Sequence, residues 1–141
     1  MTRALIAALV VLTLSSCTGE SITLRTIDDH LSRDDLQLID LREWHEIQSD
    51  GMIEGFDVIP FFTTFVHSEV LIYPTNARFH SSHILNAAAI HAMFDADKTI
   101  VLICRSGVRS RFMHDALNHL GYDVTDLGGM QHYRGNHRVY P

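Results

Sequence analysis

The chain has 141 residues, of which 46% are hydrophobic and 20% charged, and it contains two cysteines. This balance excludes collagen-like, intrinsically disordered and disulfide-framework chains, which need more glycine, more charge or more cysteine. The 11 basic and 17 acidic side chains give a formal net charge of −6. We therefore expect no nucleic-acid partner, because phosphate binding depends on clustered Lys and Arg. A chain of this length can bury a core without metal or disulfide cross-links, so we expect one compact domain.

The N-terminal segment has the pattern of an export signal. Arg3 precedes an apolar run from Ala4 to Leu14, which is too short to span a bilayer but suits a secretory signal peptide. The run ends in Leu-Ser-Ser-Cys at positions 14–17, which resembles the lipobox of bacterial lipoproteins. The resemblance implies that residues 1–16 are a lipoprotein signal peptide and that Cys17 carries the lipid.

A lipid on Cys17 implies a membrane anchor in the cell envelope, with the chain on the periplasmic side. Thr18 stands where lipoproteins retained at the inner membrane usually carry Asp, so the outer membrane is favoured. An ordinary signal peptide or a membrane-dipped N-terminal helix is the alternative. Lipidation would leave Cys104 as a solitary thiol in an oxidising compartment, which calls for a reason such as burial or chemistry.

Runs of apolar and β-branched residues predict a sheet. Leu36–Leu41 and Thr99–Cys104 are apolar at nearly every position, as expected for parallel strands covered on both faces. Three further strands are predicted, at Asp57–Ile59, at Tyr122–Leu127 and, at an edge, at Ser21–Leu24.

Helical spacing occurs between these strands. One apolar face predicts a helix that begins near Ser110, and Gly121 stands where its C-terminal cap belongs. Further helices are predicted over residues 82–94, 27–31 and 43–48. Strands that alternate with helices predict an α/β domain with a largely parallel sheet flanked by helices.

The segment from Pro60 to Phe79 shows no clear pattern. Its aromatic side chains could line a pocket, although such residues more often belong to a core. The aromatic residues concerned are Phe61, Phe62, Phe65 and Tyr73.

A six-residue loop, Cys104-Arg105-Ser106-Gly107-Val108-Arg109, joins the most apolar strand to the clearest helix. It places a thiol at the carboxyl end of a parallel strand, where open α/β sheets bind ligands. Amides at the helix N-terminus, a curl permitted by Gly107 and two arginines make the loop suited to anions. Such surroundings favour the thiolate, so we expect Cys104 to be a nucleophile and at least one arginine to contact an anion.

Four sequence motifs, in order, resemble those of the rhodanese-like sulfurtransferases. They are Asp40-Leu41-Arg42, similar to a strand-borne Asp-x-Arg; Gly51-Met52-Ile53-Glu54-Gly55, a degenerate Gly-His-Ile-x-Gly; the loop 104–109 followed by Ser110; and Gly121-Tyr122 with Leu127-Gly128-Gly129-Met130. The resemblance runs from about Ser21 to Tyr133. It implies a rhodanese-like three-layer sandwich over residues 17–141, with a short N-terminal tether.

The resemblance also implies a double-displacement mechanism. Cys104 would take a sulfur atom from thiosulfate or a persulfide donor and pass it to a thiol or another nucleophile, with no cofactor. Asp40 and Arg42 would support the structure. The substrate-binding residues would be Arg105, Ser106, Gly107, Val108 and Arg109.

Two other functions remain open. Related phosphatases and arsenate reductases use a longer Cys-x5-Arg loop, whereas Arg109 closes a six-residue loop here and Ser110 follows it, which disfavours phosphate chemistry. A rhodanese-like binding or redox-sensing module at the cell envelope is the non-enzymatic alternative, because residues 51–55 are degenerate.

The chain contains ten histidines, which raises the question of a metal site. His80 and His83 could share one helix face, but no third ligand has suitable spacing, and zinc needs three or four ligands. We therefore expect no metal site, and we interpret most histidines as surface groups.

Overall fold

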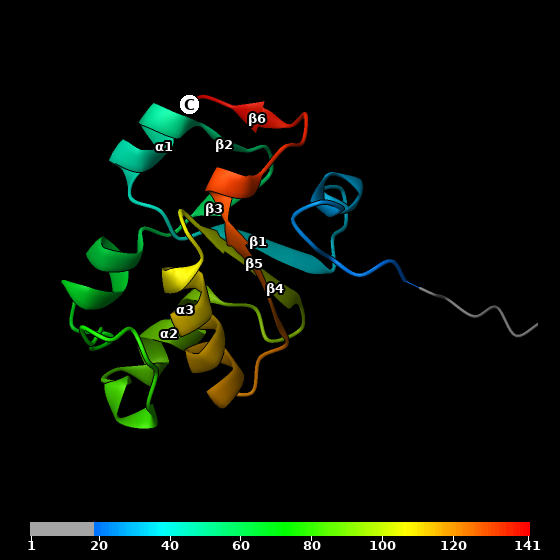
Figure 1. Cartoon of the computed structure of the whole chain (residues 1–141). Coiled ribbons are helices and arrows are strands. Elements are labelled where there is room, and N and C mark those ends of the chain that lie inside the picture. Colours follow the sequence, from blue (N-terminus) through cyan, green and yellow to red (C-terminus); the bar gives the residue numbers. More distant parts are fainter. Residues whose placement is uncertain (1–18) are drawn as a thin grey trace, which may run out of the picture.

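The computed structural model describes residues 19–141, so the predicted signal peptide and Cys17 lie outside the described residues. A four-stranded parallel sheet with the strand order β3-β1-β4-β5 forms the centre (Figure 1). Its strands are β1 (Leu36–Asp40), β3 (Asp57–Val58), β4 (Thr99–Cys104) and β5 (Val124–Gly129). A short antiparallel pair, β2 (Met52–Ile53) with β6 (Arg138–Val139), lies apart from this sheet.

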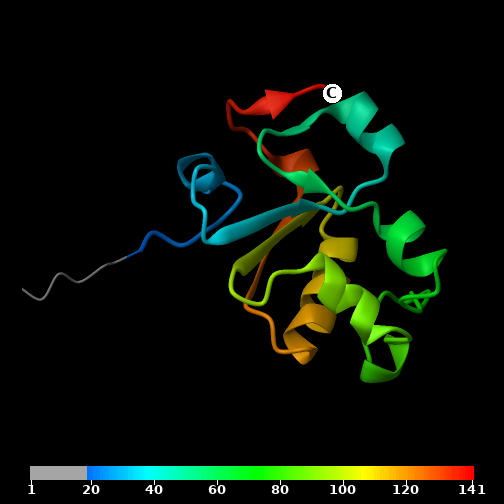
Figure 2. The same cartoon turned by 180° about the vertical axis from the view of Figure 1, so that it is seen from behind.

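In the described part of the chain, three α-helices pack around the sheet: α1 (Trp44–Asp50), α2 (Ala87–Met93) and α3 (Val108–His119). In two opposite views, α2 and α3 lie together below the sheet while α1, β2 and β6 lie above it (Figures 1 and 2). Single 3₁₀ turns occur at Ile27–His30, Ser81–His83 and Met130–His132, and one π-turn at Phe62–Val66. Within residues 19–141, no helix has the length and apolar character needed to cross a membrane.

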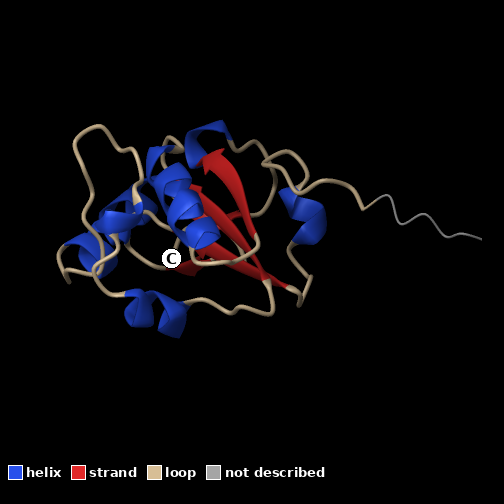
Figure 3. Cartoon of the chain, turned by 90° about the horizontal axis from the view of Figure 1, so that it is seen from below, coloured by secondary structure: helices blue, strands red, loops and turns tan. Residues whose placement is uncertain are grey.

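Alternate residues of β4 enter two separate cores. Ile100, Leu102 and Cys104 face a core that contains Phe112 of α3, which we call the α3-side core. Val101 and Ile103 face a second core with Ile47 of α1 and Met130, the α1-side core. Because side chains of a strand point alternately to opposite faces, the apolar run of β4 buries the sheet on both sides. Helices lie on both sides of the sheet (Figure 3), which confirms the predicted three-layer α/β architecture.

Most of the predicted elements occur, with shifted bounds. The helix α3 begins at Val108, two residues before Ser110, and ends before Gly121, which has φ +91°. The last sheet strand begins at Val124, two residues after Tyr122, whose side chain packs into the α3-side core.

Two sequence predictions were wrong. Ser21–Leu24 is not a strand: Thr23 and Thr26 bond each other, and the Thr26 hydroxyl donates to the Ser21 carbonyl, so local bonds replace pairing with a sheet. The helix predicted over residues 82–94 is divided into the 3₁₀ turn and α2. The Asn86 side chain accepts from the amide of Ala89 and starts a new helix there.

A buried ion pair connects the end of β1 with the start of β2. The Arg42 Nε and Nη2 atoms donate to the Asp40 carboxylate at 2.7–3.1 Å. Arg42 Nη2 also donates to the Gly51 carbonyl at 2.7 Å. The two side chains are 0% and 1% exposed. The pair thus joins the carboxyl end of β1 to the carboxyl end of α1.

We expect Asp40→Asn to destabilise the fold by about 3–5 kcal/mol, because it leaves the buried Arg42 charge uncompensated. The matched control is Asp35→Asn. Asp35 also pairs with an arginine two residues away, but that pair is 40% and 58% exposed, so its loss should leave stability near wild type. Denaturant unfolding measures both variants. If both variants lose the same amount of unfolding free energy, burial is not the reason that the Asp40–Arg42 pair stabilises the fold.

Candidate active site

The loop that follows β4 stands at the carboxyl edge of the sheet. β4 ends at Cys104, and Gly107, with φ +97°, is the N-cap of α3. The loop is pressed against the end of β5: a Cβ at Gly129 would lie 2.6 Å from the Arg105 carbonyl oxygen, and one at Gly107 would lie 3.3 Å from Gly128 Cα. Glycines on both sides therefore permit the tight curl.

Backbone amides of this loop surround the Cys104 sulfur. The N–H groups of Gly107 and Ser110 donate to Sγ at 3.1 and 3.4 Å. The Ser110 hydroxyl lies 3.5 Å from Sγ and donates to the carbonyls of Gly107 and Gly128. Amide donors held around a sulfur atom stabilise negative charge on it or on a sulfur attached to it.

The thiol itself is buried. Cys104 is 0% exposed and belongs to the α3-side core together with Phe61 and Phe112. Tyr73 packs on both aromatic rings, with centroid separations of 5.0 Å. Burial raises the pKa of Tyr73, and the nearby Cys104 sulfur raises it further. The sulfur is therefore covered by core side chains on the side away from the loop amides.

The two loop arginines differ in their surroundings. Arg109 makes two 2.7 Å bonds to the Glu46 carboxylate, and its guanidinium lies 5.6 Å from the centre of the Phe62 ring. Burial alone would lower the pKa of Arg109, but its hydrogen bonds and charge interaction with Glu46 raise it. The Arg109 charge is thus compensated from within the protein, whereas Arg105 is exposed.

Glu46 was not identified from the sequence. It lies on α1, and burial alone would raise its pKa, but hydrogen bonds from Arg109 and from the Glu43 backbone lower it below the ordinary value. Glu43 in turn accepts bonds from the Phe62 amide and the Thr63 hydroxyl, both at 2.8 Å. Only the fold brings α1, the segment after β3 and α3 together, so spacing along the chain carried no signal for this network.

The other predicted residues lie in distinct places. Ser106 and Val108 are exposed on the loop, Val108 by 50%. Phe61 and Phe65 of the unpatterned segment are buried in the core, whereas Phe62 and Tyr73 are partly exposed. Among the described residues, no group of three or more His, Cys, Asp or Glu side chains could hold a metal ion.

The family model described as "Rhodanese-like domain" matches residues 23–136. The fold is similar to that of a rhodanese-like domain protein from Staphylococcus aureus, with a TM-score of 0.56 and 20% identity over 85% of this chain and 96% of that chain. It is also similar to a rhodanese-related protein from Thermoplasma volcanium, with a TM-score of 0.54 and 21% identity over 80% and 88% of the two chains. No curated protein sequence matches the chain. The family match spans most of the chain and includes the cysteine loop, and on this ground the chain belongs to the rhodanese-like domain family.

Proposed function

We propose that this protein is a sulfurtransferase that carries sulfane sulfur on Cys104. The observation that carries the proposal is the pair of backbone amides, from Gly107 and Ser110, that donate to Sγ at the end of β4. Donors already oriented toward a developing negative charge need no reorganisation during the reaction. In this proposal the two amides stabilise the negative charge of the transferred sulfur atom.

The transfer consists of two displacements. The Cys104 thiolate attacks the outer sulfur of a donor such as thiosulfate, a new S–S bond forms, and the old S–S bond breaks so that sulfite leaves with the electron pair. An acceptor thiolate then attacks the outer sulfur of the persulfide, and the Cys104 thiolate leaves. The covalent intermediate divides one difficult transfer into two easier steps. No external oxidant or reductant is needed.

Burial of Cys104 favours a second candidate, a binding or redox-sensing module. A thiol that is 0% exposed is protected from chance oxidation, but it also needs a local opening before a donor can reach it. The loading of sulfur distinguishes the two functions, because a module that only binds a partner does not form a persulfide.

We expect thiosulfate to add the mass of one sulfur atom to the wild-type chain and nothing to Cys104→Ser. The variant retains Cys17, so in a chain that carries no lipid it also controls for sulfur added at Cys17. Intact-mass spectrometry after incubation with thiosulfate, or with a small-molecule persulfide, makes the measurement. Absence of the added sulfur from the wild type would favour the binding module, and equal addition to both chains would place the reaction elsewhere.

The Glu46–Arg109 pair should make stability depend on pH. The pKa of Glu46 is lowered in the folded chain, so the stabilisation is fully present above the ordinary glutamate pKa and is lost as the pH falls through the lowered value. We expect Glu46→Gln to reduce stability by about 2 kcal/mol at pH 7. The difference from wild type should shrink below about pH 4.

Denaturant unfolding of wild type and Glu46→Gln at pH 7 and pH 3 tests this expectation. Glu69→Gln is the matched control, because Glu69 is exposed and should change little at either pH. A Glu46→Gln deficit of the same size at both pH values would show that the loss comes from packing rather than from charge.

We also propose that a lipid on Cys17 anchors the chain to the outer membrane, facing the periplasm. The support is the Leu-Ser-Ser-Cys sequence with Thr18 after it. In this location the donor would be a small anion such as thiosulfate or a persulfide, and the acceptor a thiol of a small molecule or a protein.

We expect Cys17→Ala to be lost from the outer-membrane fraction of a bacterial host, because one residue carries the lipid. Fractionation with immunodetection measures the distribution, and a density gradient separates inner from outer membrane. Cys104→Ser, which also removes one thiol, should remain in the membrane. Retention of Cys17→Ala in the outer-membrane fraction would refute the lipid anchor.

A further inference from the structure

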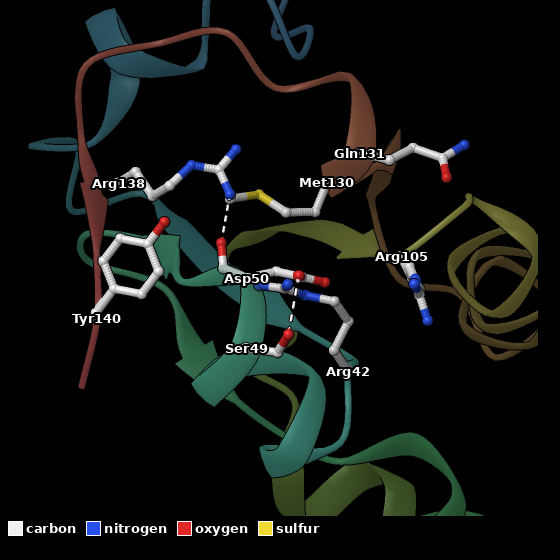
Figure 4. Close-up of a pocket in the computed structure, with 8 residues that line it drawn as sticks. All are labelled: Arg42, Ser49, Asp50, Arg105, Met130, Gln131, Arg138 and Tyr140. Atoms are coloured by element: carbon white, nitrogen blue, oxygen red, sulfur yellow. Dashed lines mark hydrogen bonds between the residues drawn. The ribbon is translucent and has the colours of Figure 1, made fainter.

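A cavity of about 410 Å³ lies beside the catalytic loop, between β6, the end of α1 and the segment that follows β5. Three arginines line it, and each comes from a different part of the chain: Arg42 follows β1, Arg105 belongs to the loop, and Arg138 lies on β6. Tyr140 stands on one side of the cavity and Arg105 on the opposite side (Figure 4). The volume lies in the range of small-molecule sites.

The arginines retain unused hydrogen-bond donors. A guanidinium presents five N–H groups, and Arg42 uses Nε and Nη2 for Asp40 and Gly51. Its Nη1 atom is buried and has no partner in the described part of the chain, and the side chain, which is 0% exposed, lines the cavity. A buried donor without a partner costs free energy, so an acceptor placed in this cavity would remove that cost.

The other two arginines are also under-used. Arg138 donates from Nη1 to the Asp50 backbone carbonyl and packs 5.7 Å from the Tyr133 ring centre. Within residues 19–141, no hydrogen bond involves the Arg105 side chain. A purely structural role, to bind the last carbonyls of α1, accounts for the bonds from Arg42 to Gly51 and from Arg138 to Asp50. That role does not account for the unpartnered Arg42 Nη1 atom or for the position of Arg105.

The electrostatic balance of the cavity is positive in an acidic protein. The cavity is lined by three positively charged guanidinium groups and by one carboxylate, that of Asp50. A second carboxylate, that of Asp40, is paired with Arg42. The Asp50 carboxylate accepts a 3.2 Å hydrogen bond from the Ser49 hydroxyl. Its negative charge would repel a bound anion and weaken binding. Gln131 adds an amide, and Met130 and Tyr140 add apolar surface.

The cavity is separate from the thiol. Cys104 points into the α3-side core, whereas Met130, which lines the cavity, belongs to the α1-side core on the other face of the sheet. Arg105 follows Cys104 directly and is the residue common to the loop and the cavity. A ligand here would therefore contact the loop without occupying the position of the transferred sulfur.

We propose that this cavity binds a small oxyanion, held by Arg42, Arg105 and Arg138. The common chemistry is a sulfate-, phosphate- or carboxylate-type group whose oxygens accept several N–H bonds. The oxyanion is either a free inorganic ion or the charged group of a small organic molecule that rests on Met130 and Tyr140. Binding does not require sulfur transfer, so this site can exist even if the proposed enzymatic function fails.

Isothermal titration of the full chain carrying Cys104→Ser tests the site without interference from the nucleophile. The probes are inorganic sulfate, inorganic phosphate and benzenesulfonate, with chloride as the background ion. We expect Arg138→Gln to weaken binding about tenfold, because it removes a charged donor, and Asp50→Asn to strengthen it about threefold, because it removes an opposing charge. Tighter binding of benzenesulfonate than of sulfate indicates an organic ligand, and the reverse indicates a free ion.

Two further variants keep the test decisive. Arg111→Gln makes the same charge change on an exposed residue of α3 and should bind as before. Gln131→Glu adds a negative charge at an exposed lining residue, so it should weaken binding even if Arg138→Gln folds poorly. The proposal is overturned if no probe binds at millimolar concentration, if Arg111→Gln weakens binding as much as Arg138→Gln, or if Asp50→Asn fails to strengthen it.

Discussion

The alternation of side chains along β4 is the constraint on which the rest of the structure depends. The strand is buried on both faces, with Ile100 and Leu102 in one core and Val101 and Ile103 in the other. Its last residue, Cys104, takes the next position in this alternation and so faces the α3-side core. Arg105 follows beyond the strand. The packing of a hydrophobic strand thereby determines which face of the sheet holds the thiol and which face can hold a separate cavity.

Close packing and charge compensation together preserve the shape of the loop. Gly129 lets the loop backbone approach β5 more closely than a Cβ would allow, and Gly107 adopts the positive φ that the turn requires. Glu46 holds Arg109 with two bonds and thereby ties α3 to α1. Separating such a partly buried pair requires much free energy, because each charge would be left uncompensated in the low-dielectric protein interior. The amides that face the Cys104 sulfur are thus held by contacts from both neighbouring layers.

Local patterns predicted the parts of the fold that local physics controls. The continuous apolar runs gave β1 and β4 with bounds close to those observed, and the spacing of apolar residues with Gly121 gave α3. The predicted strand at Ser21–Leu24 was wrong because threonine side chains there bond the backbone. The antiparallel pair of β2 and β6 was not predicted, because each strand has only two residues and its partner lies far along the chain.

By itself, the sequence determined the α/β class, the order of the main elements and the loop that begins at Cys104, because strand and helix periodicities and a glycine turn are properties of neighbouring residues. The tertiary structure alone decided that Glu46 would hold Arg109, that Cys104 would be buried, and that Arg42, Arg105 and Arg138 would surround one cavity. These outcomes depend on which segments meet across the sheet. Attraction between charges that are far apart along the chain leaves no mark in the spacing of its residues.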